Sequence, residues 1–286
     1  SIEPPEKCAV CGKCQPKQSE DVFDTWFSSA LWPFATLGWP KKTKDLEQFY
    51  PTDIICTARD IINLWVVRMI FSSLELLKKI PFKEIIIHAT ILAKDGRRMS
   101  KSLGTGINPM DLIERYGADA TRFGLAWQIT ELQDIRFGEE NMVAGKKFCN
   151  KIWNASRFVM QQVGGDKLKT GERPKALTEE DKKVLNSLDR VVKKVDKDLA
   201  KFCFGSAIQE VYHFFWHEFC DIYIEKSKEQ IRDEKTAANT KKLLIYVLAN
   251  SLKVLHPFMP FITEEIYQYL PLENKKALII EDWPKS

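Results

Sequence analysis

The sequence has no long uninterrupted apolar segment. None of its apolar runs reaches the ~18 residues of a membrane-spanning helix, and the residues after Ser1 lack the pattern of a secretory signal peptide. Histidine is scarce, with four among 286 residues, and none stands in a His-Glu-x-x-His motif. We therefore expect a cytoplasmic protein in a reducing environment, with no membrane contact and no zinc-protease centre.

The sequence also lacks a strong excess of one charge. Its formal net charge of +4 permits contact with an acidic polymer but does not indicate it. The hydrophobic content of 44% is enough for real cores, and the 29% of charged residues indicates a well-solvated surface. A chain of this length and composition suits two globular domains.

Cysteine pairs are missing except at one place. Cys8, Cys11 and Cys14 form two overlapping Cys-x-x-Cys steps, a spacing that brings sulfur atoms together on one side of a tetrahedral zinc site. No second pair follows, so the other ligands would lie upstream of Ser1, come from water or a partner, or not exist. We expect this half site to be relevant to zinc only in a longer parent protein.

The most distinctive segment is residues 95–106, which reads Asp-Gly-Arg-Arg-Met-Ser-Lys-Ser-Leu-Gly-Thr-Gly. Arg97, Arg98 and Lys101 supply positive charge, Ser100 and Ser102 supply hydroxyl donors, and glycines let backbone N–H groups approach an anion. This chemistry suits polyphosphate binding. The alternative is an ordinary solvated basic turn, and composition alone favours that alternative.

The first half of the chain has the pattern of an α/β domain. Residues 53–57 and 84–92 are β-branched and predict strands, the second of them buried, and residues 60–77 between them predict a helix. Such a βαβ unit is parallel and right-handed, and it binds ligands at the carboxyl ends of its strands. The residues after each strand are therefore expected to face one crevice. A helix should begin after the basic loop at Asn108, with Pro109 in its first position.

The second half, from about Glu139, predicts an all-α bundle. A capping signal at residues 178–181 precedes apolar residues at helical spacing up to Leu199. Similar periodicity marks residues 148–159, 208–223 and 243–255, and residues 164–175 predict a linker. Four aromatic residues in this half are expected in the core rather than as base-stacking platforms. They are Trp153, Phe215, Trp216 and Phe219.

Residues 98–104, Arg-Met-Ser-Lys-Ser-Leu-Gly, resemble the Lys-Met-Ser-Lys-Ser signature of the class I aminoacyl-tRNA synthetases. Arg98 replaces the first lysine, which keeps the charge but changes an ammonium into a planar fork, while Lys101 matches the second lysine. Other segments that match in family order cover nearly the whole chain: residues 21–34, 60–69, 116–123, 150–158 and 256–261. The run Trp-Phe-Ser-Ser-Ala-Leu-Trp-Pro at residues 26–33 is similar to the valyl branch.

The resemblance implies a fold class of α/β followed by all-α. Residues 21–138 would be the C-terminal part of a Rossmann-like catalytic domain, and residues 139–286 a helical anticodon-binding domain. Residues 1–20 would be a zinc-knuckle-like remnant at the end of an insertion.

The resemblance also implies the chemistry: valine is activated by ATP with Mg²⁺ to valyl-adenylate and then transferred to tRNA(Val), by a monomeric enzyme. The implied catalytic residues are Lys101, Arg98, Ser100 and Ser102. The implied ATP-binding residues are Arg98, Met99, Lys101 and His88. Trp26, Asp60 and Ile61 would bind the amino acid, with Asp60 holding its ammonium group.

Two family features have no counterpart in the sequence. The His-x-Gly-His motif is absent, and so is a hydrolytic editing domain, which the family needs because a valine pocket rejects isosteric threonine poorly. We therefore expect the chain to be a C-terminal part of a larger synthetase that makes no valyl-adenylate unaided. Two alternatives remain: an RNA-binding module that acts without ATP, or a non-catalytic interaction protein, which only the change to Arg98 supports.

Overall fold

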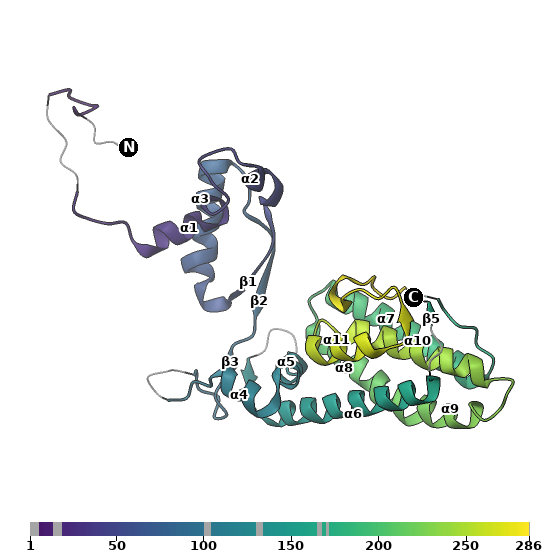
Figure 1. Ribbon diagram of the computed structural model, residues 1–286. Coiled ribbons are helices and arrows are strands. Elements are labelled where there is room, and N and C mark those ends of the chain that lie inside the picture. The colour runs from purple at the N-terminus through teal and green to yellow at the C-terminus, as the bar shows by residue number, and fades with distance from the viewer. Residues whose placement is uncertain are drawn as a thin grey trace. The chain divides into compact units, whose positions relative to one another are not determined.

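The computed structural model describes residues 6–13, 19–99, 104–129, 134–164, 168–169 and 172–285. The chain divides into two compact units, Ser1–His88 and Ala89–Ser286 (Figure 1). Among the helices of these described residues, none combines the length and the apolar character that crossing a membrane requires.

The first unit is built on two parallel strands. β1 (Thr52–Ala58) pairs with β2 (Phe82–His88) from Thr52 opposite Phe82 to Ala58 opposite His88, which confirms the predicted parallel βαβ pair. The connection is less regular than the single helix predicted for residues 60–77. It begins as a 3₁₀ turn (Arg59–Ile61), continues as a π-helical segment (Ile62–Val66) and only then becomes α3 (Val67–Leu77). The backbone of Ile61, at φ −107° and ψ 12°, leaves the α-helical region and separates the two turns.

Two further helices complete this unit: α1 (Thr25–Ala35) and α2 (Lys44–Phe49). α1 packs beside α3 (Figure 1), and the Trp65 indole N–H donates to the Ser29 carbonyl at 3.3 Å. The small core lies between the helices and one face of the sheet. It contains Ile55, Val66, Met69 and Phe82.

The predicted buried strand over residues 84–92 is wrong in two respects. β2 ends at His88, and Ile91 and Leu92 form a separate strand, β3 (Ile91–Leu92). The apolar side chains are not buried either, since Ile85 is 40% exposed. A strand of a parallel sheet is buried only where both faces are covered. In β1 only alternate residues such as Ile55 are buried, which shows that the described helices cover one face.

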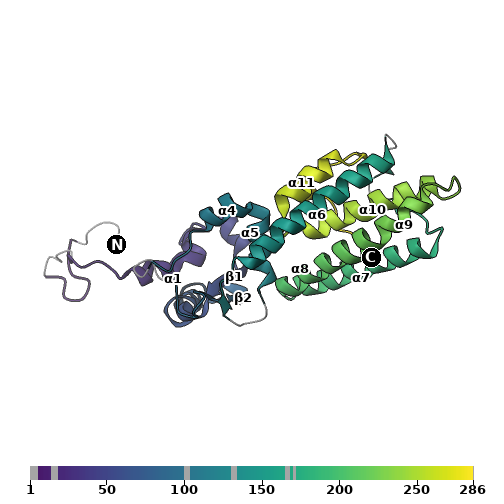
Figure 2. The same cartoon turned by 90° about the horizontal axis from the view of Figure 1, so that it is seen from below.

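The second unit is mainly helical. The sequence predicts an all-α bundle only from about Glu139, whereas this unit also contains helices over residues 109–116 and 118–127. Its helices are α4 (Pro109–Tyr116), α5 (Ala118–Trp127), α6 (Glu140–Val163), α7 (Glu179–Leu199), α8 (Phe204–His213), a π-helical segment (Phe214–Tyr223), α9 (Ile224–Gln230), α10 (Ala237–Leu255), α11 (Pro260–Tyr269) and a 3₁₀ turn (Leu278–Ile280). Figure 2 shows α6, α7, α8 and α10 running alongside one another. Two short parallel pairs accompany them: β3 with β4 (Ile135–Arg136), and β5 (Leu168–Lys169) with β6 (Leu272–Glu273).

The start of α7 confirms the predicted capping signal. The Asp181 N–H donates to the Thr178 hydroxyl at 3.1 Å, and the Thr178 N–H donates to the Asp181 carboxylate at 3.1 Å. Asp181 is fully buried and also accepts the hydroxyl of Tyr223 at 3.0 Å. Burial and the nearby carboxylate raise the pKa of Tyr223. The capping residue Asp181 therefore also connects α7 to the π-helical segment through a buried hydrogen bond.

The bundle core is rich in aromatic rings. Phe148 on α6 is fully buried, with ring centroids of Phe123, Tyr212 and Phe215 within 6 Å. The predicted core positions of Phe215 and Phe219 are confirmed, since both are 0% exposed. Trp216 packs at the margin of the core. The prediction for Trp153 is wrong: it is 41% exposed, because α6 turns this position outward while its neighbour Ile152 is buried.

Candidate functional site

The basic loop is joined to the bundle through a small sheet. The Ile135 N–H donates to the Thr90 carbonyl at 2.9 Å, and the Phe137 N–H donates to the Leu92 carbonyl at 2.9 Å. The Asp134 carboxylate accepts the Thr90 N–H at 3.1 Å. β4 lies directly before α6 in the sequence, so the first strand of the loop is fixed to the start of the longest helix.

A tight hairpin turn forms the first part of the loop. The Ala93 N–H donates to the Arg97 carbonyl and the Gly96 N–H to the Ala93 carbonyl, both at 2.8 Å. Gly96 has φ +86°, a conformation that favours glycine. Arg97 forms an ion pair with Asp95 at 2.7 Å, and the hydrogen bonds from Arg97 lower the pKa of Asp95. Arg98 then forms an antiparallel bridge with Leu92, so the hairpin returns along β3.

Only part of the predicted loop site lies in the described residues. Arg98 is exposed, and the side chain of Met99 packs against a small apolar cluster of Leu112, Phe137 and Met142. Met99 is half-buried there, and its predicted contact with ATP stays a prediction. Ser100, Lys101 and Ser102 lie outside the described residues, so their predicted roles stay predictions.

The far end of the loop leads into α4 as the sequence predicts. Asn108 is the N-cap, its side-chain oxygen accepts the Met110 N–H at 3.1 Å, and Pro109 occupies the first position. At its other end α4 is clamped to the residue before α6. Arg115 donates to both oxygens of Glu139, at 2.7 and 2.9 Å, and the Tyr116 hydroxyl donates to Glu139 at 2.5 Å. These hydrogen bonds, first from Tyr116 and then from Arg115, lower the pKa of Glu139.

The predicted amino-acid-binding residues lie in the first unit. Asp60 and Ile61 sit in the 3₁₀ turn that directly follows β1, Asp60 exposed and Ile61 half-buried. Because Ala58 pairs with His88, Asp60 and His88 lie at the same edge of the β1–β2 sheet. Trp26 is a half-buried residue of α1, one turn before Ser29, whose carbonyl holds Trp65. The structure thus ties the helix of Trp26 to the helical segment that follows Asp60.

The cysteine knuckle is described in part. The Gly12 N–H donates to the Cys8 carbonyl at 2.9 Å, and Gly12 has φ +66°, so the chain turns tightly between Cys8 and Gly12 as a knuckle requires. Within the described residues, no three histidine, cysteine or carboxylate side chains gather in a metal-binding arrangement. Cys14 lies outside these residues, so the zinc site stays a prediction.

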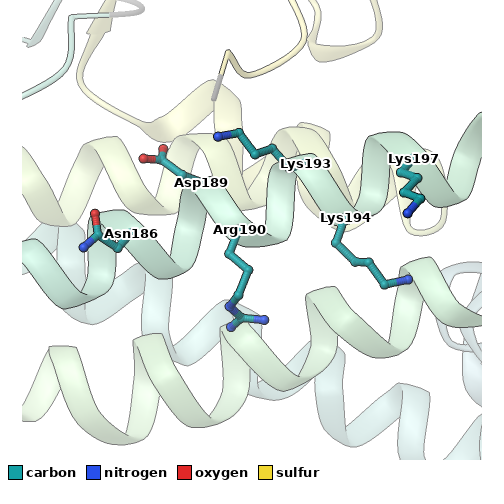
Figure 3. A pocket seen from close by; sticks show the side chains of 6 residues that line it. All are labelled: Asn186, Asp189, Arg190, Lys193, Lys194 and Lys197. Carbon is teal, nitrogen blue, oxygen red and sulfur yellow. The ribbon is translucent and has the colours of Figure 1, made fainter.

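A cationic groove on α7 is a feature that sequence reasoning did not single out. It has a volume of about 550 Å³ and is lined by Asn186, Asp189, Arg190, Lys193, Lys194 and Lys197 (Figure 3). Arg190 pairs with Glu210 and Glu218, and Asp189 pairs with Arg173. Lys193 and Lys197 have no ion-pair partner among the described residues, so their charges are available to an anion. The signal in the sequence is their i, i+4 spacing on the polar side of an amphipathic helix.

Comparisons with known proteins agree with this architecture. Residues 5–138 match the family of tRNA synthetases class I (I, L, M and V), and residues 181–286 match the anticodon-binding domain of tRNA ligases. Residues 5–138 therefore carry a class I tRNA synthetase domain and residues 181–286 an anticodon-binding domain, which confirms the predicted family resemblance and the fold class of α/β followed by all-α.

The curated relatives are more specific. The chain is 48% identical over its whole length to the valine--tRNA ligase of Clostridium tetani and 46% identical to that of Thermotoga maritima. The predicted similarity to the valyl branch is confirmed. In both cases the match spans 32% of the relative, so the chain covers about a third of the length of these proteins.

Solved structures share the fold. The LeuRS of a ternary complex, LeuRS-tRNA-LeuAMS, from Agrobacterium radiobacter K84 matches 97% of this chain and 34% of its own, with a TM-score of 0.80 at 20% identity. A Mycobacterium tuberculosis methionyl-tRNA synthetase in complex with methionyl-adenylate matches 89% of this chain and 51% of its own, with a TM-score of 0.73 at 18% identity.

Proposed function

We propose that this chain contributes to the ligation of valine to tRNA(Val). The observation that carries the proposal is the continuous similarity to valine--tRNA ligases across both family domains, with Lys101 of the signature retained. In this proposal residues 21–138 belong to the catalytic domain and residues 139–286 bind tRNA. The phosphates of tRNA would contact the groove that contains Lys193 and Lys197.

The proposed reaction has two steps. The valine carboxylate attacks the α-phosphate of ATP, supplied with Mg²⁺, and pyrophosphate leaves. A hydroxyl group of tRNA then attacks the valyl carbonyl of the adenylate, which forms the ester and releases AMP. Catalysis of the first step depends on positioning and on neutralising the charge that develops on the leaving group. Lys101 would neutralise this charge, while Arg98, Ser100 and Ser102 would shape the loop over the phosphates.

The other proposed roles follow from position. Asp60 would hold the ammonium group of valine, and Ile61 and Trp26 would line the pocket for its side chain. The exposed carboxylate of Asp60 and its place after the carboxyl end of β1 support this assignment, because ligands of parallel sheets bind at that edge. His88, at the same edge, would contribute to ATP binding.

A chimeric enzyme tests the proposal. The third of the Clostridium tetani valine--tRNA ligase that aligns with this chain is replaced by this chain, and valine-dependent exchange of pyrophosphate into ATP is measured. The chimera is expected to be active. Lys101→Ala should lower the exchange rate about 10²- to 10³-fold with little change in valine affinity, as expected for loss of one charge-stabilising donor.

Lys94→Ala is the matched control, because Lys94 is an exposed lysine of the same hairpin. It should leave the rate nearly unchanged. A folded chimera whose activity does not depend on valine, or is insensitive to Lys101→Ala, contradicts the proposal.

A further inference from the structure

Residues 98–99 and 136–137 lie at the base of the basic loop, and their side chains alternate between the same two faces of the small sheet. Met99 and Phe137 both point into the apolar cluster with Leu112 and Met142, where Phe137 is 8% exposed. Consecutive residues of extended chain point to opposite faces. Arg98 and Arg136, each one residue earlier, therefore both point away from this cluster, and both are exposed.

The strand register places the two arginines beside each other. Leu92 pairs with Arg136 on one side, in the parallel β3–β4 ladder, and with Arg98 on the other side, through the antiparallel bridge. Residues directly opposite one another in a sheet share a face. Arg98 and Arg136 are thus separated by one strand, or roughly 10 Å between their backbones at the usual strand spacing. Arginine side chains are long enough to bring two guanidinium groups from this separation onto one anion.

The turn before Arg98 keeps Arg136 at the loop. A Cβ on Gly96 would lie 3.5 Å from both Nε and Nη2 of Arg136, so the guanidinium lies against the bare backbone of this turn. No ion pair engages Arg136 within the described part of the chain. Arg97, by contrast, is paired with Asp95. Arg136 is therefore a cation at the loop base without an ion-pair partner among the described residues.

We propose that Arg136 is a polyphosphate-binding residue that acts together with Arg98. A planar guanidinium binds phosphate oxygens through two parallel hydrogen bonds, and two such groups on one face of a sheet suit a chain of linked phosphates better than a single phosphodiester. This inference rests on the proposed function, because it takes the anion at the loop to be the polyphosphate of ATP. The inference adds Arg136 to the proposed ATP-binding residues, although Arg136 lies about 35 positions after the signature motif and on a different strand.

Isothermal titration of the 286-residue chain with sodium tripolyphosphate, without divalent cations, tests the proposal. Arg136→Gln should weaken binding about five- to tenfold, comparably to Arg98→Gln, as expected for loss of one charge-assisted contact. Arg136→Lys should recover part of the affinity, because it restores the charge without the fork. Arg232→Gln is the matched control, an exposed arginine in the turn after α9, and should stay within about twofold of the parent chain. All variants should keep the parent melting temperature.

The outcomes separate this inference from the proposed function. If Arg98→Gln weakens binding and Arg136→Gln behaves as the control, the role of Arg136 is wrong while the loop keeps its proposed anion. If Arg136→Gln weakens binding of a single-stranded RNA but not of tripolyphosphate, the polyphosphate assignment is wrong. If the parent chain does not bind tripolyphosphate, the inference fails, and the exchange assay of the chimera still decides the proposed function.

Discussion

The two units of the chain differ in how they bury their apolar side chains. In the bundle, the large side chains of Phe148, Phe215 and Phe219 are fully buried in one continuous core. In the first unit, the core is small, and α3 carries apolar residues on two sides. Met69 is buried, whereas Val67 and Phe71, at helical spacing on another side, are 45% and 57% exposed.

This difference separates what local sequence determines from what packing determines. A helix with apolar residues on several faces is stable only if other parts of the protein cover those faces. In the bundle, neighbouring helices provide this cover. In the first unit, the described residues cover only one apolar face of α3. The stability of the bundle should therefore be the greater of the two.

Urea unfolding of the 286-residue chain provides the strongest test of this contrast. We expect two transitions, the first from the unit Ser1–His88 and the second from the bundle. Phe148→Ala should lower the free energy of unfolding of the second transition by about 3–5 kcal/mol, because it removes a buried ring from a packed aromatic cluster.

The matched variant Phe71→Ala removes the same side chain from an exposed position of α3. Its effect should stay within about 0.5 kcal/mol. The contrast between the units is wrong if Phe71→Ala destabilises the chain as much as Phe148→Ala, or if hydrogen exchange shows the bundle opening before the first unit.

Sequence patterns predicted the parts of the fold that depend on local chemistry. The capping residues Thr178 and Asp181 and the start of α4 at Asn108 were predictable, because each depends on residues close together in the sequence. The parallel pairing of β1 with β2 joins distant residues such as Thr52 and Phe82, and it followed from the rule for strand–helix–strand units. The 3₁₀ and π-helical turns after Ala58 were not predictable, since the apolar pattern of residues 60–77 is that of a regular helix and gives no signal for the break at Ile61. The outward position of Trp153 was missed because composition does not give the rotation of a helix.

The candidate site shows the same division. The loop motif could be identified from consecutive residues of the sequence. The role of Arg136 could not, because its place beside Arg98 depends on the pairing of both residues with Leu92. The clamp between Arg115 and Glu139 likewise joins residues 24 positions apart. Such contacts between distant segments carry no local signal in one sequence.

A measurement of tRNA binding compares the two units by function. The proposed function assigns tRNA binding to the bundle. Reversing two charges in the α7 groove should therefore weaken tRNA binding without changing the first unfolding transition. For the double variant Lys193→Glu and Lys197→Glu we expect about tenfold weaker binding of tRNA at moderate salt. The slope of log affinity against log salt should fall in magnitude by about 2, one for each lost phosphate contact.

The control reverses Lys226 and Lys235, two exposed lysines of the bundle that do not line the groove. It alters net charge equally but should change affinity much less. Equal loss of affinity in both double variants would mean that net charge alone governs binding, and the assignment of the α7 groove would be wrong.

The smallest expected effect concerns the clamp that fixes α4 to the start of α6. Hydrogen bonds from Tyr116 and Arg115 lower the pKa of Glu139 from its ordinary value of 4.5. A carboxyl group with a lowered pKa in the folded state stabilises the fold above pH 4.5, and this contribution is lost as the pH falls through the lowered pKa. Glu139→Gln should therefore lower the melting temperature of the bundle at pH 7 by about 1–2 °C, a small shift because the pair is solvent-exposed.

The difference between the parent chain and Glu139→Gln should shrink steadily when the pH is lowered below 4.5, because protonation then removes the charge from the parent as well. Glu114→Gln on the same helix is the control and should give no pH-dependent difference, since Glu114 has no such clamp among the described contacts. A difference for Glu139→Gln that stays constant from pH 7 to pH 3 would show that the clamp acts through packing of the side chain and not through its charge.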